Sequence, residues 1–157
     1  MTTAQHIAKH FKEVNFGGNW TWSNVKDVLS GITWEQSVKQ VHGCNTIATL
    51  TFHMNYFVEA IINVLEGNAL DSKDELSFAH PPITSQQDWD AMVQKSLNNA
   101  EKLTALIEKL PDSKLNEVFV QEKYGTYYRN LHGLIEHTHY HLGQAAIIKK
   151  IVLAEGK

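Results

Sequence analysis

The sequence predicts an all-α protein that forms a four-helix bundle in a single domain, residues 1–157. Apolar residues recur at intervals of three and four positions in four long segments, as they do on the buried faces of helices. Long connections join the last three segments, and no repeat, low-complexity tract or linker divides the chain. The segments are residues 3–30 (interrupted near residue 18), 46–65, 85–110 and 126–154.

The first segment is expected to form two helices, residues 3–16 and 20–30. Gly17, Gly18 and Asn19 separate them, because glycine is a poor helix former. In the second piece, one apolar stripe is expected to face inward; it comprises Trp20, Trp22, Val25 and Leu29. The T-x-x-Q pattern from Thr33 to Gln36 predicts a capping box that opens a short helical turn.

The second long helix is predicted over residues 46–65, with Asn45 as its N-cap and Gly67 just beyond its end. On a helical wheel, one face carries residues suited to a core and, at its middle, a single histidine, His53. This face consists of Thr46, Leu50, His53, Phe57, Ala60 and Val64. An ionisable ring in the middle of a core-facing stripe requires an explanation.

The third helix follows a connection, residues 68–84, that is long enough to run the length of a bundle. Ser85 is expected to cap this helix, and Pro111 is expected to end it. Residues 112–125 form a second connection, with a short extended stretch near Phe119. Thr126 is then expected to cap the last helix.

The last helix carries His137 and His141, four positions apart. At 3.6 residues per turn the two rings lie on one face, one turn apart, while His139 points to the opposite side. Spacing alone leaves two explanations, since a buried histidine can be neutral and hydrogen-bonded or can bind a metal ion. His53 supplies a third imidazole if the second and fourth helices are neighbours. The sequence thus predicts a metal site formed by His53, His137 and His141.

Three neutral imidazoles leave a divalent ion its full charge and an open coordination position. Such an ion lowers the pKa of bound water towards ~7 or binds a thiol as thiolate, and zinc, nickel or iron all suit nitrogen ligands. The motif His-Glu-x-x-His is absent, since Thr138 follows His137, and Glu136 points about a quarter-turn away. We expect any catalysis to depend on the metal, and the sequence assigns no catalytic residue or organic cofactor.

Several other residues have both a functional and a structural interpretation. Tyr56 and Tyr140 flank the histidine faces as pocket-border or packing residues. Asn130 and Gln144 lie close to the ligand direction, where they either orient an imidazole or hydrogen-bond between helices. Cys44 precedes the second helix, and we expect a structural or surface role for it rather than a reactive one.

Composition excludes several classes of function. The net charge of −3 and the absence of a lysine or arginine cluster give no basis for binding nucleic acid. No apolar run is long enough to span a membrane, and the polar N-terminal residues do not resemble a signal peptide. A single cysteine suits a reducing compartment. We therefore expect a cytoplasmic protein with neither nucleic acid nor membrane as a partner.

The stretch LHGLIEH-x-x-x-H-x-GQ, within residues 127–150, resembles the C-terminal signature of the DinB-like superfamily, the DNA-damage-inducible and YfiT-type metal-binding bundles. Residues 23–35, SNVKDVLSGITWE, and the stretch TIATLTFHMNYF resemble the first and second helices of that family. The resemblance implies an up-down-down-up bundle with a long crossover between helices two and three, often as a homodimer. It also implies a divalent metal ion on three histidines, here His53, His137 and His141.

The resemblance leaves the reaction open. Some relatives are transferases or isomerases that use a low-molecular-weight thiol, so one expectation is a metal-dependent enzyme acting on a small thiol and an electrophilic substrate. The alternative is a non-catalytic metal-binding protein in a stress response or a sensor. A third reading is a structural bundle whose histidines are satisfied by hydrogen bonds alone.

Overall fold

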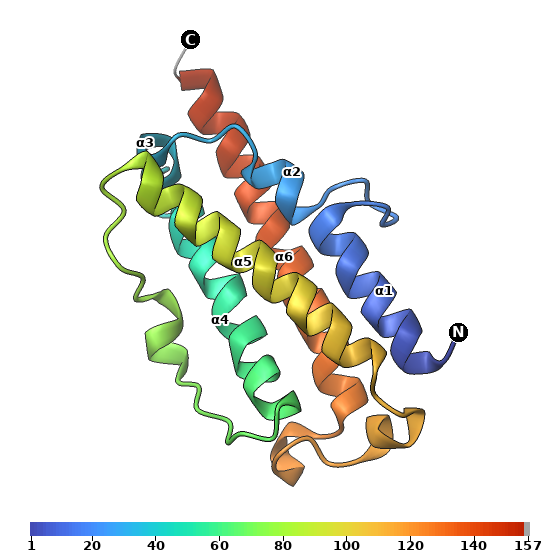
Figure 1. Cartoon of the computed structure of the whole chain (residues 1–157). Helices are drawn as coiled ribbons and strands as arrows, with labels where there is room; N and C mark the ends of the chain where they lie inside the picture. The colour runs from blue at the N-terminus through green and yellow to red at the C-terminus, as the bar shows by residue number, and fades with distance from the viewer. Residues whose placement is uncertain (156–157) are drawn as a thin grey trace.

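The computed structural model describes residues 1–155 and is all-helical; Gly156 and Lys157 of the predicted domain lie outside the described residues. Four of its six α-helices are long (Figure 1). The α-helices are α1 (Thr3–Phe16), α2 (Val25–Leu29), α3 (Trp34–Ser37), α4 (Ile47–Leu65), α5 (Gln86–Glu108) and α6 (Tyr127–Glu155). Three short 3₁₀ turns, η1 (Asp74–Phe78), η2 (Asp112–Asn116) and η3 (Glu122–Tyr124), lie in the connections.

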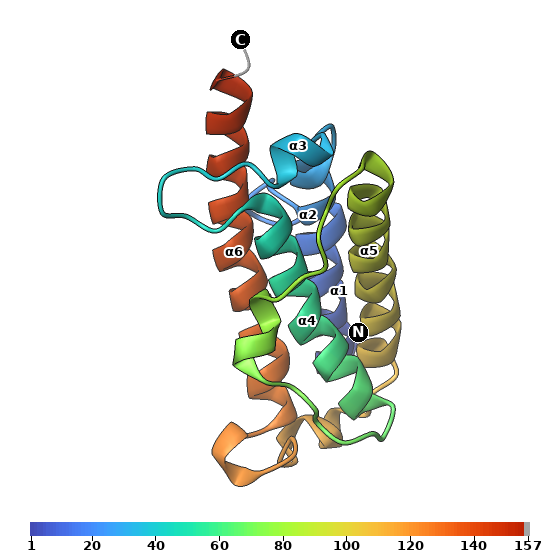
Figure 2. The same cartoon turned by 90° about the vertical axis from the view of Figure 1, so that its left-hand side faces the viewer.

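The four long helices enclose one hydrophobic core. Helices α1 and α4 each contact both α5 and α6, as the two views show (Figures 1 and 2). Each long helix contributes a large side chain that is almost completely removed from water; these are Phe11, Leu50, Leu103 and Leu142. Burial of such side chains is the main source of stability in a helical domain, and here it fixes α4 beside α6.

Local signals determine where most helices begin. The Thr33 side chain accepts a hydrogen bond from the Gln36 backbone N–H in the predicted capping box, and Ser85 and Thr126 accept from backbone N–H groups at the starts of α5 and α6. The prediction for α4 was wrong by one residue. Its N-cap is Thr46 rather than Asn45, because the Thr46 hydroxyl accepts from the Thr49 N–H.

The predicted helix over residues 20–30 is largely wrong. Only Val25–Leu29 is helical, and Trp20 and Trp22, which were expected to face inward, are 95% and 91% exposed. The Asn19 amide donates to Thr21 Oγ1 and to the Ser23 carbonyl. These bonds close a non-helical turn where the first turn of the predicted helix was expected. Trp22 has a φ of 57°, in the left-handed region. Side-chain hydrogen bonds of this kind compete with helix formation.

The connection from α4 to α5 passes along the outside of α4 (Figure 2), and its turn η1 lies against that helix. The connection from α5 to α6 contains η2, η3 and an isolated bridge between Val118 and Thr126, so only the first residue of the extended stretch expected near Phe119 pairs with another segment. Both connections lie next to the histidine-bearing faces of α4 and α6. Within residues 1–155, none of the helices is both long and apolar enough to cross a membrane.

Candidate metal centre

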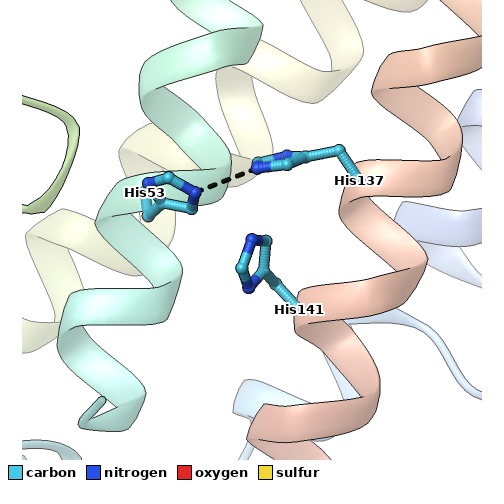
Figure 3. A group of neighbouring side chains, drawn as sticks. All are labelled: His53, His137 and His141. Atoms are coloured by element: carbon cyan, nitrogen blue, oxygen red, sulfur yellow. Dashed lines mark hydrogen bonds between the residues drawn. The ribbon is translucent and has the colours of Figure 1, made fainter. Parts of the chain in front are cut away.

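The three predicted histidines meet between α4 and α6 (Figure 3). His53 comes from the middle of α4, and His137 and His141 come from successive turns of α6. Each ring offers a nitrogen, and these three atoms lie within 4.8 Å of one another. The closest pair is His53 Nε2 and His137 Nε2, 3.0 Å apart. Nitrogen atoms bound to one ion at about 2.0–2.1 Å have separations of this order, so the geometry suits a metal site.

The cluster is poorly accessible to water. His53 and His141 are 6% and 8% exposed, and His137 is half-buried. The Phe57 ring lies edge-on to both His53 and His137, and the Phe78 ring stacks on His53 with its centroid 4.0 Å away. Apolar surroundings of this kind disfavour protonated imidazoles and strengthen electrostatic interactions with any bound cation.

Burial sets the protonation of the cluster. Desolvation, together with the neighbouring His141 and His53 rings, lowers the pKa of His137 to about 4. Desolvation and then His141 also lower the pKa of His53, although the bond to Ser77 and the charge of Asp74 oppose this. Both rings are therefore neutral at pH 7, which is the form that binds a metal ion.

A serine from the crossover connection orients His53. Ser77 Oγ lies 2.9 Å from His53 Nδ1 and 2.6 Å from the Asp74 carbonyl oxygen. Because the hydroxyl donates its only hydrogen to that carbonyl, it accepts from the imidazole, and Nδ1 of His53 carries the proton. The lone pair of His53 is then on Nε2, the atom that faces His137.

A glutamine one turn further along α6 performs the same task for His141. Gln144 Oε1 accepts a hydrogen bond of 2.9 Å from His141 Nδ1, which places the proton on Nδ1 and the lone pair on Nε2. In Figure 3 one ring nitrogen of His141 points towards the other two rings. Partners of this type fix ring orientation and raise ligand basicity at metal sites. Of the two alternatives for Gln144, this hydrogen bond fits the one in which it orients an imidazole.

The remaining ring, His137, is held less completely. Its Nε2 contacts His53, whereas its Nδ1 is buried and has no hydrogen-bond partner. Since Ser77 keeps the His53 proton on Nδ1, the 3.0 Å contact in the metal-free protein requires His137 Nε2–H to donate to His53 Nε2. Three imidazoles, two of them with their lone pairs already directed inward, fit a divalent transition metal. No other group of three histidine, cysteine or acidic side chains in residues 1–155 has metal-binding spacing.

The other candidates have structural roles or lie outside the cluster. The Tyr56 hydroxyl accepts from the Lys73 N–H and so fastens the crossover, while Tyr140 is 66% exposed and places its ring edge-on to His141. The Asn130 amide donates to the Tyr124 and Thr126 carbonyls, which gives it a structural role rather than an imidazole to orient. Cys44 and Glu136 are exposed, as expected for residues without a direct role at the ion.

A cavity of about 830 Å³ adjoins the cluster and shares His137 with it. Its walls come from α4, from the first turns of α6 and from both long connections. The residues that surround it include Phe57, Ala60, Ile61, Asp74, Phe119, Arg129, His132, Gly133, Leu134 and Glu136. Small-molecule sites usually have volumes of about 300–1,000 Å³, so this one has room for a ligand next to the predicted metal ligands.

Two residues that bear on the site were missed from the sequence, Ser77 and Phe78. Both lie in η1, within a connection that shows no helical periodicity, and neither is near His53 in sequence. The one available signal was the length of that connection, which predicted a crossover along the bundle but not the residue that reaches His53. A long connection without periodicity fixes no register, so sequence spacing could not identify them.

Comparison of the chain with protein-family models, with curated proteins and with solved structures finds no match. The assignment of the site therefore rests on its geometry and on the chemistry of its donors.

We expect Ser77→Ala to weaken the binding of Zn²⁺ or Ni²⁺ by about 10- to 100-fold, because His53 loses the acceptor that fixes its Nε2 lone pair. Gln144→Ala should act similarly through His141, whereas Gln144→Glu should retain affinity because a carboxylate also accepts from Nδ1. Competition titration against a chromophoric chelator measures these affinities. Ser72→Ala, on the same connection but at the cavity wall, serves as the control. Unchanged affinity in Ser77→Ala would contradict this role.

Acid should destabilise the chelator-treated protein between about pH 6.5 and pH 4. In this window the unfolded chain protonates His137, whereas the folded protein, with its pKa at about 4, does not; the free energy of unfolding therefore falls as pH falls. We expect a loss of about 2 kcal/mol, below the full value of the shift because the ring is partly solvated. Urea unfolding at several pH values measures it.

The variant His137→Asn should show a shallower pH dependence, because Asn does not titrate. His42→Asn makes the same substitution at an exposed histidine outside the cluster, where Asn tolerates the φ of 47°, and it serves as the control. Parallel curves for wild type and His137→Asn would show that His137 is not responsible.

Proposed function

We propose that this protein binds one divalent transition-metal ion through His53, His137 and His141. One observation carries the proposal: the three imidazoles converge within 4.8 Å, and Ser77 and Gln144 hold the protons of two of them on the side away from the centre. Held in this way, His53 and His141 present their Nε2 atoms to the centre of the cluster, as ligands of a shared ion do. Zinc, nickel and iron(II) all accept this donor set.

We further propose that the metal acts on a small molecule in the adjoining cavity, as in a metal-dependent transferase or isomerase that uses a low-molecular-weight thiol. A divalent ion on three neutral imidazoles supplies Lewis acidity and lowers the pKa of a coordinated thiol or water. The chain supplies the rest: Phe57 and Phe78 exclude water from the imidazoles, and the cavity gives a substrate access beside His137. The electrophilic substrate would occupy the cavity with the thiol.

A second candidate function is non-catalytic metal binding in a stress response or a sensor. The observation that favours it is the burial of His53, which is covered by the stacked Phe78 ring, and of His141. A site built mainly for retention of the ion has this character. The two functions share one metal centre and differ in whether the ion takes part in turnover.

The same geometry supports membership of the DinB-like superfamily as a proposal, since the three converging histidines are those that the resemblance implied. The contacts of α1 and α4 with α5 and α6, and the long connection between α4 and α5, support the up-down-down-up bundle of that family. We also propose the homodimer, on the resemblance alone. Light scattering of the purified protein tests it, and a monomer at micromolar concentration would exclude it.

Purified protein should contain close to one equivalent of a divalent metal per chain, and His53→Ala should lose it. The change removes the ligand that comes from α4, 84 positions before His137 in sequence. His139→Ala is the matched control, because it lies between His137 and His141 but packs against His10 on the other side of α6. Elemental analysis and chelator titration measure the content. Equal content in the wild type and His53→Ala would overturn the proposal.

The metal should also raise the free energy of unfolding, by about 2.7 kcal/mol at a concentration 100 times its Kd, because it binds only the folded chain.

Metal-loaded wild type should accelerate the addition of thiols such as glutathione or cysteine to small electrophiles, and His137→Ala should reduce the rate at least 100-fold. The reason is that His137 is the ligand at the cavity wall. A spectrophotometric assay over a panel of thiols and electrophiles measures the rate. Metal uptake with no difference in rate between wild type and His137→Ala would favour the non-catalytic function.

A further inference from the structure

The cavity beside His137 is lined by both charged and apolar side chains. We propose that it binds a small-molecule carboxylate with an apolar body, whose carboxylate is held by Arg129 and whose other end lies at His137. The inference deepens the proposed function, and it rests on that function for what happens at the His137 end. The binding step itself depends on the cavity alone.

Arg129 is the only arginine in the chain, and it lies at the cavity wall. Its Nη1 donates to the Tyr124 carbonyl oxygen at 3.1 Å, and among residues 1–155 it forms no ion pair with an acidic side chain. A guanidinium has five N–H donors and binds carboxylates through two parallel hydrogen bonds. Most of its donors are therefore available to a ligand.

The loop before α6 holds this arginine in place. Gly125 has a φ of 75°, and a Cβ atom at that position would lie 3.0 Å from Arg129 Cδ, so the absence of a side chain lets the backbone pack against the arginine stem. The packing restrains the stem of this solvent-exposed side chain, and the bond to Tyr124 restrains one end of its guanidinium before any ligand arrives. Preorganisation of this kind reduces the entropy lost on binding.

The apolar body of the ligand is implied by the wall between the two ends. Phe57, Ala60 and Ile61 form a continuous face of α4, and Leu134 faces the cavity from α6. Arg129 and His137 are eight residues apart on one helix, or about 12 Å along its axis. A ligand of about that length, apolar in its middle, spans both ends.

The other charged groups at the cavity select among anions. Asp74 and Glu136 lie in its lining, and their carboxylates repel negative charge, while His132 adds a titratable ring. These carboxylates would repel a doubly charged phosphate about twice as strongly as a singly charged anion, and only one arginine offsets the repulsion. A singly charged carboxylate is repelled less, and it can still form two parallel hydrogen bonds with the guanidinium, so the chemistry favours carboxylates over phosphates.

Two matched probes test the proposal: 5-phenylpentanoate and its neutral amide, 5-phenylpentanamide. Wild-type protein should bind the carboxylate at least tenfold more tightly by isothermal titration calorimetry, and Arg129→Gln should abolish the preference. Lys123→Gln is the control, because it removes the same charge from the neighbouring turn η3 at a residue that does not line the cavity. Equal affinity for the two probes, no saturable binding, or the same loss in Lys123→Gln would overturn the proposal. 4-Phenylbutyl phosphate should bind more weakly than the carboxylate; tighter binding would also overturn it.

A pair of glycine substitutions on α6 tests the location. Gly133 lines the cavity and Gly143 is exposed, and a Cβ atom at either position meets nothing within 4 Å. Gly133→Leu should project a side chain into the cavity and weaken binding of the carboxylate at least tenfold, while Gly143→Leu should not. Both changes raise helix propensity, so folding is retained and circular dichroism verifies it. Binding that survives Gly133→Leu would place the ligand elsewhere and overturn the proposal.

All titrations are run on metal-loaded and on chelator-treated protein, with the metal content measured in parallel. Carboxylate preference without metal uptake would exclude the proposed metal function and leave this inference standing. Metal uptake without a preference for the carboxylate would exclude this inference and leave the proposed metal function standing.

Discussion

The site depends on the close approach of two rings, His53 and His137. They are 84 positions apart in sequence and lie on different helices. Two ring nitrogens 3.0 Å apart tolerate little change in how α4 packs on α6. The helices can hold this distance because each is anchored in the core by fully buried side chains near the cluster, such as Leu50 of α4 and Leu142 of α6. The core of this protein thus sets the distance between His53 and His137 as well as the stability of the fold.

Placing three imidazoles in this core has an energetic cost, since buried polar groups destabilise a fold unless they find partners. Two rings have found them: His53 donates to Ser77, and His141 donates to Gln144. His137 has an unpartnered Nδ1 and the most strongly lowered pKa of the described histidines. The missing hydrogen bond is therefore on His137, the ring that borders the cavity. A ligand or an ion would change the surroundings of this ring most.

Much of this site could be predicted from the sequence, because it is built on long helices. Helical spacing put His53 in the middle of a core face and paired His137 with His141, and the same spacing identified Gln144 near the ligand direction. Periodicity is reliable over several turns, since burial repeats with each turn. It fails in short segments, which is why the helix expected over residues 20–30 shrank to Val25–Leu29.

What escaped prediction depends on tertiary contacts. Ser77 and Phe78 reach His53 only because their connection passes back along α4, and no local pattern encodes that path. Large apolar residues are usually buried, but Trp20 and Trp22 are exposed because they lie in a turn that the Asn19 amide closes. The parts of the chain that lack regular spacing were thus the parts that sequence reasoning could not place.

The turn η1 provides Ser77, which orients His53, and Phe78, which covers the His53 ring. If an ion binds the three imidazoles as proposed, any effect of that binding on the position of η1 is reciprocal: a change in the position of the turn would alter the affinity for the ion by the same factor.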